Sequence, residues 1–346
     1  MRAPAFWWQA KPSAAALALW PAAAIYGRAA AHRLDKKPEA VAPVPVICVG
    51  NFTVGGAGKT PTAIALARLA IAHGLRPGLL VRGYGGSEKG PAMVDIKSHT
   101  AAQVGDEALL LAAAAPTVVS ADRPAGAARL AAEGCELIVM DDGFQNPSLA
   151  KDLSLLVVDS TFGFGNGLIL PAGPLRAPVH SQIARAGGLV IVGDGPHAGP
   201  MVRLAARAGK PAIRGRLAPL RPGLWRSRPI LAYAGIGRPE KFFATLAECD
   251  APVHAQVPFP DHHVYTIADA DYLLRRAERE GLRLVTTAKD MARLKGAQGL
   301  MAELREKSEA FEVVLDFEHP DQVARMIETT VARVTVQRGS APQRRR

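Results

Sequence analysis

A glycine-rich stretch, "TVGGAGKTP" at residues 53–61, constrains the fold of this chain most. It follows the short apolar run "PVPVICVGN" and precedes "TPTAIALARLAIAHG", which has the composition of a helix and ends at a glycine. In this strand–loop–helix order, backbone N–H groups at the helix N-terminus can bind phosphate. Gly58, Lys59 and Thr60 match the end of the pattern G-x-x-x-x-G-K-[ST], but Thr53 replaces its first glycine. The stretch predicts a nucleotide site, and a glycine-rich connector is the alternative.

Each position of this loop has an expected role. The glycines at 55, 56 and 58 permit positive φ angles and let a ligand approach the backbone closely. Lys59 supplies a positive charge for the terminal phosphates, and the Thr60 hydroxyl can ligate Mg²⁺. The predicted nucleotide contacts are Thr53, Val54, Gly55, Gly56, Ala57, Gly58, Lys59, Thr60 and Pro61.

Apolar strand-like runs alternate with helical runs through the first two thirds of the chain. The strand-like runs after the loop include "RPGLLVRGYGG", "TVVSAD", "CELIVMDDG", "LSLLVVDS" and "GLVIVGDG", and the helical runs include "GDEALLLAAAA" and "RPAGAARLAAEG". Such alternation predicts a mostly parallel sheet with helices on both faces. Together with the loop, it predicts an α/β fold like that of the P-loop NTPases.

Residues 195–229 are rich in proline and glycine and lack periodicity, which predicts a domain boundary. We expect a P-loop core at 31–225, a smaller α/β domain at 226–335, and a basic, disordered tail at 336–346. Residues 1–30 are expected to form a separate N-terminal helix.

The N-terminal run from Ala14 to Ile25 has no charged side chain, but it is short for a bilayer span and contains Pro21. Aromatic residues surround it, and a basic segment follows it. The aromatic residues are Phe6, Trp7, Trp8, Trp20 and Tyr26, and the basic residues are Arg28, Arg33, Lys36 and Lys37. We expect this helix to lie at a membrane interface; a core helix and a transmembrane span are the alternatives.

The composition restricts the possible partners. The formal net charge is +11, which suits nucleic acid, an anionic membrane or a phosphorylated substrate. Aromatic residues make up only 5%, and no basic stripe is interleaved with them, so we expect no nucleic-acid partner. The three cysteines are far apart, which argues against a disulfide framework or a zinc site. Cys48 and Cys135 are expected to be buried structural thiols.

Two acidic motifs carry candidate chemistry. Asp141 and Asp142 in "IVMDDGFQN" end a buried strand, where open α/β sheets bind ligands, and one such acid usually accompanies the Mg²⁺ of a P-loop. The alternative is a turn or helix-capping acid. Asp106 and Glu107 in "VGDEALLL" open a helix, so either a helix-dipole role or a catalytic role fits them.

A histidine motif and several arginines complete the candidates. Asp261, His262 and His263 in "FPDHHVY" can form a base with its orienting acid. The arginine candidates are Arg82, Arg123 and Arg176, each of which is a weak signal alone. From the residues alone, the chain is predicted to be a Mg²⁺-dependent P-loop phosphotransferase near a membrane.

The motifs also match a known family. "VGNFTVGGAGKTP", "RGYGG", "GDE", "DDGFQN", "LPAGPLR", "GIGRPEKFF", "FPDHHVY" and "TTAKD" occur in that order. Together they resemble the tetraacyldisaccharide 4′-kinases of Gram-negative lipid A synthesis, from the apolar N-terminus to about residue 330. The resemblance implies ATP and Mg²⁺ as cofactors, and an acylated glucosamine disaccharide phosphate as the substrate. It also implies work at the cytoplasmic face of the inner membrane, which gives the apolar N-terminus a reason.

The resemblance implies a role for each matching residue. Lys59 and Thr60 would hold phosphate and metal, Asp106 would be the catalytic base, and His262 would pair with it. Glu107, with Asp141 or Asp142, would be a ligand of the metal or of its water shell. Arg176 and Arg123 would neutralise phosphate. Gln145 would lie near the nucleotide or acceptor. Two positions depart from the family: Asn146 replaces His, and Ala288 replaces Glu, so we assign no chemistry to them. The histidine match is ambiguous by one residue, and we favour His262 over His263.

Two other functions compete with this assignment. A P-loop ATPase or kinase for a small soluble substrate would not need the aromatic-rich apolar N-terminus. A membrane-associated nucleotide switch that binds GTP would carry the guanine-recognition motif N-K-x-D, which "TAKD" at Thr287–Asp290 matches only in part.

Overall fold

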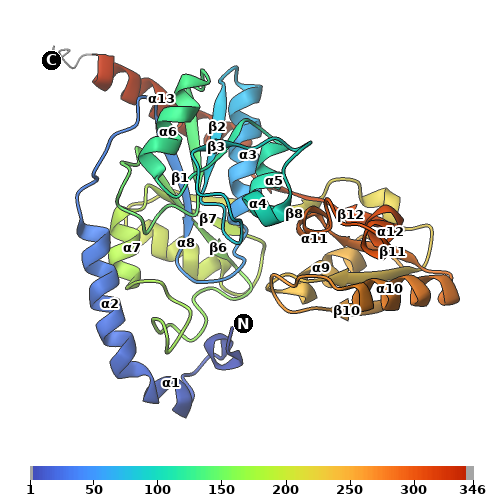
Figure 1. Cartoon of the computed structure of the whole chain (residues 1–346). Helices are drawn as coiled ribbons and strands as arrows, with labels where there is room; N and C mark the ends of the chain where they lie inside the picture. The colour runs from blue at the N-terminus through green and yellow to red at the C-terminus, as the bar shows by residue number, and fades with distance from the viewer. Residues whose placement is uncertain (1–2, 340–346) are drawn as a thin grey trace.

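The strands within residues 3–339 form two sheets, one of nine strands and one of four (Figure 1). The computed structural model describes residues 3–339. The large sheet has the strand order β13-β8-β7-β6-β1-β5-β2-β4-β3, and only its two edge strands, β13 and β3, are antiparallel to their neighbours. The predicted fold, a mostly parallel sheet flanked by helices, is confirmed.

The strands of the large sheet are short and largely buried. They are β1 (Val46–Asn51), β2 (Pro77–Val81), β3 (Ala92–Met93), β4 (Thr117–Val119), β5 (Leu137–Asp141), β6 (Leu153–Asp159), β7 (Gly188–Val192), β8 (Ala212–Pro219) and β13 (Val313–Phe317). Successive side chains of a strand face opposite sides of the sheet. Ile47 and Val49 of β1 therefore enter one core and Val46 and Cys48 the other, which is why the central run has no polar side.

Helices cover both faces of this sheet. On one face lie α3 (Lys59–Ala72), α4 (Ala101–Val104), α5 (Asp106–Ala112) and α13 (Pro320–Gly339). On the other lie α6 (Arg123–Ala132), α7 (Val179–Arg185) and α8 (Ala198–Arg207). The cysteines at 48, 135 and 249 are free and buried, as structural thiols are expected to be.

The small sheet is wholly parallel, with the order β10-β9-β11-β12. Its strands are β9 (Ile230–Ala234), β10 (Val253–Pro258), β11 (Arg283–Thr287) and β12 (Ser308–Phe311). The helices are α9 (Pro239–Glu248) on one face, α10 (Ile267–Glu280) and α12 (Leu300–Lys307) on the other, and α11 (Ala288–Arg293) after β11. In Figure 1, α11 lies at the side of the small sheet that faces α4 and α5.

Two parts of the structure differ from the expectation. Residues 195–229, expected to be irregular, contain α8 and β8, and only the end of this stretch, with the 3₁₀ turn η2 (Pro222–Trp225), connects the sheets. The sequence placed 226–335 together, but β13 pairs with β8 and α13 packs on α3, so the chain returns to the large sheet from residue 313. Of the expected tail, 336–339 continues α13, and 340–346 lies outside the described residues.

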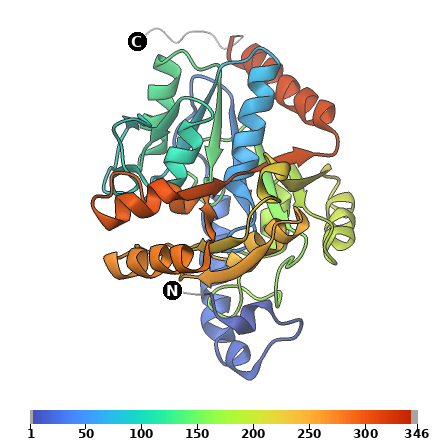
Figure 2. The ribbon, with the colours of Figure 1, turned by 90° about the vertical axis from the view of Figure 1, so that its right-hand side faces the viewer.

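The N-terminal segment consists of the 3₁₀ turn η1 (Ala5–Trp8), α1 (Ala14–Ala18) and α2 (Trp20–Asp35). Pro21 lies in the first turn of α2, so it marks a helix start rather than a break within one helix. Figures 1 and 2 show α1 and α2 at the lower end of the molecule, projecting beyond both sheets. No helix within residues 3–339 is both long and apolar enough to cross a bilayer.

Candidate active site

The glycine-rich loop leaves the carboxyl end of β1 at the centre of the large sheet and enters α3. Gly55 and Gly58 have φ angles of 104° and 96°, which only glycine adopts readily. A Cβ atom added at Gly55 or Gly56 would meet nothing within 4 Å, so the loop is open to a ligand on that side. Thr53 forms a bridge with Leu175, which keeps the loop entry extended and removes the need for the missing first glycine.

The loop residues beside the helix start contact a buried acid of β5. The Thr60 hydroxyl donates to Asp141 Oδ2 at 2.9 Å, and Asp141 Oδ1 is buried without a hydrogen-bond partner among the described residues. Burial, followed by the nearby Glu107 carboxylate, raises the pKa of Asp141 to about 7. This acid therefore lies in a place that favours a cation. Lys59 Nζ lies 3.8 Å from the neighbouring carboxylate of Asp142.

Asp142 follows the last residue of β5, and its surroundings differ from those of Asp141. Asp142 turns off the strand with φ 51°, and its side chain is 36% exposed. Arg176 pairs with it, with Nη1 at 3.1 Å from Oδ1 and Nη2 at 3.2 Å from Oδ2. Arg176 Nε also donates to the Thr53 carbonyl, so this guanidinium lies along the loop entry.

Three other residues singled out in the sequence, Gln145, Arg123 and Asn146, also belong to the unit of the large sheet. Gln145 donates to the Asn51 carbonyl at 3.0 Å and accepts from Arg176 at 3.5 Å, which places it beside the loop. Arg123 is buried at the start of α6 and donates to the Ser120 carbonyl, so part of its guanidinium is occupied by its own loop. The Asn146 side chain closes a turn, since its Oδ1 accepts from the Ser148 amide, and its backbone carbonyl accepts from Lys151.

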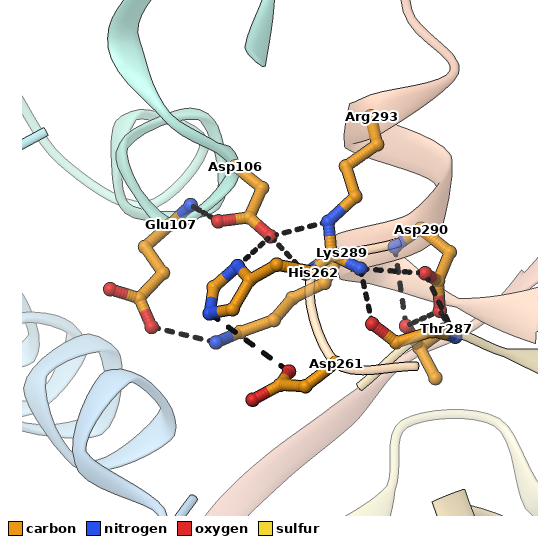
Figure 3. A network of polar contacts seen from close by, with 9 residues as sticks. Asp106, Glu107, Asp261, His262, Thr287, Lys289, Asp290 and Arg293 are labelled. Atoms are coloured by element: carbon orange, nitrogen blue, oxygen red, sulfur yellow. Dashed lines mark hydrogen bonds and ion pairs between the residues drawn. The ribbon is translucent and has the colours of Figure 1, made fainter. Parts of the chain in front are cut away.

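The second acidic motif meets residues of the small sheet in one polar network (Figure 3). Asp106 is the first residue of α5, and its side chain is 6% exposed. Its Oδ1 accepts from the Glu107 amide at 2.8 Å, and its Oδ2 accepts from Arg293 Nε at 2.8 Å. Burial pushes the pKa of Asp106 up, but the cationic Arg293 and Lys289 outweigh it and hold this pKa below its usual range.

The two histidines of "FPDHHVY" point to different partners. His262 Nδ1 lies 4.0 Å from Asp106 Oδ2, and its imidazole is 45% exposed. His263 Nε2 instead lies 2.9 Å from Asp269, and its ring stacks on Phe259. His262 is thus the histidine that approaches Asp106, and its backbone takes a positive φ of 55° to do so.

Two cations of this network were missed by the sequence analysis. Lys289 Nζ lies 2.7 Å from Glu107 Oε1, and Arg293 binds Asp106. Both come from α11, which begins within the "TTAKD" motif, and Lys289 is the lysine of that motif. Their i, i+4 spacing puts them on one face of a helix, and this was the available signal.

Glu107 connects the network to the phosphate loop. Burial raises the pKa of Glu107, but Lys289 and then Lys59 outweigh it and lower that pKa. The Glu107 carboxylate in turn opposes the ionisation of Asp141, which is one cause of the raised pKa of Asp141. The loop, the two acids of α5 and His262 therefore lie around one place, between the two sheets.

A loop of this form after the central strand, with a hydroxyl and a buried acid at its far end, defines a P-loop nucleotide-binding protein of the phosphotransferase kind. The comparisons with known proteins give the family. Residues 15–332 match the family described as Tetraacyldisaccharide-1-P 4′-kinase. The chain belongs to this family.

Individual relatives and a solved structure agree. A Tetraacyldisaccharide 4′-kinase of Methylobacterium sp. is 54% identical over 302 residues, covering 87% of this chain and 91% of the relative. One from Sinorhizobium fredii is 50% identical over 330 residues, covering 95% of each. The structure of LpxK from Aquifex aeolicus in complex with ATP is 27% identical, covers 91% of this chain and 99% of its own, and has a TM-score of 0.70.

The chain is therefore an ATP-dependent kinase of lipid A biosynthesis. It transfers the γ-phosphate of ATP to the 4′-hydroxyl of tetraacyldisaccharide 1-phosphate. This assignment replaces the two competing functions, a kinase for a small soluble substrate and a nucleotide switch.

Proposed function

We propose that phosphoryl transfer takes place between the glycine-rich loop and the Asp106–His262 pair, with Mg²⁺ bound and with the enzyme at the cytoplasmic face of the inner membrane. The observation that carries this proposal is the 4.0 Å approach of His262, from the small sheet, to Asp106, from the large one. A pair assembled from two units lies at an interface where two substrates can meet.

The loop residues would bind the phosphates of ATP. We assign Thr53 to Pro61 to the nucleotide because the loop is open beside Gly55 and Gly56, and because the Lys59 side chain at its helix end is 12% exposed. Phosphoryl transfer needs little covalent work from the protein and much neutralisation of charge. Lys59 would neutralise the terminal phosphates, together with Arg176 across Asp142 and, less directly, Arg123. Gln145, bonded to Arg176, would orient that guanidinium.

The residues present fit a magnesium ion. Asp141 Oδ1 lacks a hydrogen-bond partner among residues 3–339, its Oδ2 accepts from Thr60, and burial, followed by the Glu107 carboxylate, raises its pKa. No group of three His, Cys, Asp or Glu within those residues is placed to cage a metal, but Mg²⁺ is usually held by one or two carboxylates, phosphates and water. Thr60 and Asp141 would hold it, with Glu107 and Asp142 near its water shell. When bound, Mg²⁺ supplies positive charge to the transferring phosphate.

The acceptor hydroxyl needs a base, since a sugar hydroxyl is a poor nucleophile at neutral pH. We assign that role to Asp106 with His262 beside it, a step that contributes ~10²–10⁴-fold in typical enzymes. The proton of the 4′-hydroxyl would pass to this pair while its oxygen attacks the γ-phosphorus. The bond between that phosphorus and the oxygen of the leaving ADP would then break.

The N-terminal helices would bring the enzyme to its lipid. Each buried CH₂ of an acyl chain contributes about 0.8 kcal/mol, so four chains keep the substrate in a bilayer. Leu17, Trp20 and Ile25 expose 58%, 57% and 70% of their area, and the basic residues Arg28 and Arg33 are exposed on α2. An apolar surface with a basic flank is typical of interfacial helices. The substitutions Leu17→Ser, Trp20→Ser and Ile25→Ser together should abolish co-sedimentation with anionic vesicles, and unchanged sedimentation would contradict this part.

The main test is ³²P transfer from [γ-³²P]ATP to tetraacyldisaccharide 1-phosphate in detergent micelles. Wild type is compared with Lys59→Ala and Asp106→Ala, each with Mg²⁺ and with EDTA. We expect labelled lipid from wild type with Mg²⁺ only, and a strong reduction in both variants. Wild-type rates from Asp106→Ala, or unchanged transfer in EDTA, would refute the assigned base or the metal.

A further inference from the structure

We propose that Arg293 is a positioning residue for the phosphoryl transfer, which holds Asp106 and the His262 loop in the arrangement that accepts the proton. The inference rests on the proposed role of Asp106 as base. Arg293 lies on α11, outside the loop and outside every residue assigned so far to ATP, metal or acceptor. It is nevertheless one of the least exposed arginines of the small sheet, at 11%.

Arg293 determines where the Asp106 carboxylate lies. A carboxylate has about four hydrogen-bond positions on its two oxygens. On Asp106, the Glu107 amide binds Oδ1, and Nε and Nη2 of Arg293 both bind Oδ2. Donors on two elements hold this carboxylate in place (Figure 3). Three of its four acceptor positions are filled, so one remains for the incoming proton.

Arg293 is itself fixed by a buried scaffold. Its Nη1 donates to Asp290 Oδ1 at 2.9 Å and to the Gly235 carbonyl at 2.6 Å. Asp290 is fully buried and accepts from the Thr287 hydroxyl at 2.6 Å and from the Gly235 amide at 3.2 Å. Contacts to Asp290 and Gly235, both in the unit of the small sheet, thus hold the guanidinium where it reaches Asp106 on α5.

The same scaffold holds the histidine. The Gly235 carbonyl that accepts from Arg293 also accepts from the His262 amide at 3.0 Å. The bond supports the positive φ of His262, a conformation that costs energy for a residue with a side chain. One backbone carbonyl therefore links the arginine that binds Asp106 to the loop that presents His262, so loss of Arg293 releases both members of the pair.

Lysine cannot replace this contact fully. A guanidinium presents its donors in a planar fork, whereas an ammonium is a single point of charge. In the Arg293→Lys variant, the ammonium would retain attraction to Asp106 but would lose the simultaneous bonds to Asp106 and Gly235. We expect Arg293→Lys to fall between wild type and Arg293→Gln in turnover, and this graded rescue is a property of positioning.

The test measures kcat and the KM for ATP in Arg293→Gln, Arg293→Lys, Asp106→Ala and the double variant Asp106→Ala/Arg293→Gln. A displaced catalytic group costs on the order of 100-fold, so we expect that loss in kcat for Arg293→Gln, with the KM for ATP within about threefold of wild type. The double variant should equal Asp106→Ala alone, because Arg293 acts through the Asp106–His262 pair, which Asp106→Ala already disables. Arg283→Gln is the matched control: Arg283 is 13% exposed, pairs with Glu309 away from the site, and should keep wild-type kcat.

The outcomes separate this inference from the proposed function. Wild-type turnover in Asp106→Ala overturns the assigned base and this inference together. An impaired Asp106→Ala with an unimpaired Arg293→Gln, or with losses that add in the double variant, overturns the role of Arg293 alone. If Arg293→Gln does not fold by circular dichroism, the Arg293→Lys cycle replaces it, and additive losses there overturn the inference equally.

Discussion

Gly105, which precedes Asp106, offers a direct test of how the fold places the proposed base. Its φ and ψ are 86° and 151°, a region that essentially only glycine occupies. A Cβ atom added there would lie 2.7 Å from the Tyr84 carbonyl oxygen, a backbone atom that cannot rotate away. We predict that Gly105→Ala impairs catalysis by displacing Asp106.

The magnitude follows from the local strain. A residue forced into such a conformation costs about 1–3 kcal/mol. If the backbone keeps its path, that cost lowers the free energy of unfolding. If the segment moves instead, the cost falls on the position of Asp106, and at 1.36 kcal/mol per tenfold in rate it corresponds to roughly 5- to 160-fold in kcat. The contact with a backbone oxygen favours the second result.

The assay combines lipid phosphorylation with urea unfolding. Gly74→Ala is the control, because Gly74 also has a positive φ, 79°, but a Cβ there meets nothing within 4 Å and the residue ends α3 away from the site. We expect Gly74→Ala to lose about 1 kcal/mol of stability without a change in kcat. A Gly105→Ala enzyme with wild-type stability and wild-type kcat would refute the reasoning.

Three further predictions concern the site and its supports. Asp106→Ala and His262→Ala should each lower kcat more than ATP affinity. The fold loss in kcat of their double variant should be far smaller than the product of the two single losses, and a loss equal to that product would contradict a catalytic pair. Asp141→Asn should raise the Mg²⁺ concentration for half-maximal transfer, and an unchanged Mg²⁺ titration would remove Asp141 as a ligand. Burial raises the pKa of Asp269, but the bond from His263 and the helix-cap bonds outweigh it and lower the pKa. A carboxyl group whose pKa is lower in the folded state than in the unfolded state stabilises the fold at pH values above its unfolded pKa, near ~4. Wild type should therefore be more stable than Asp269→Asn at pH 6, and this difference should disappear as the pH falls towards 3.

The local pattern of the chain determined much of the fold. Glycines with an adjoining lysine and threonine can take few conformations other than the loop at 53–61, and alternating apolar runs have few alternatives to a parallel sheet. These signals come from neighbours in the chain, so they are visible in the sequence. Asp141 ends β5, and Thr60 lies at the start of α3, after the loop that leaves the adjacent strand β1, so a parallel sheet brings the two to the same edge.

Other features depended on residues that are far apart. The sequence placed β13 and α13 with the small unit, because nothing in residues 313–339 identifies the strand to which they return. It also predicted no helix or strand where α8 and β8 form, because the surrounding prolines and glycines obscured the periodicity of their short apolar faces.

The division is clearest in the polar network. The sequence proposed Asp106 and a histidine of "FPDHHVY" from their residue types, and it favoured His262 although the motif match was ambiguous by one residue. Which one approaches Asp106 depends on the path of the backbone at Gly235, and Arg293 enters the site only because α11 packs against α5. Residue type and spacing determine the local chemistry of each motif. Tertiary packing decides which motifs come together in one site, because Asp106 and Arg293 are 187 positions apart in the chain and meet only when the two sheets are in place.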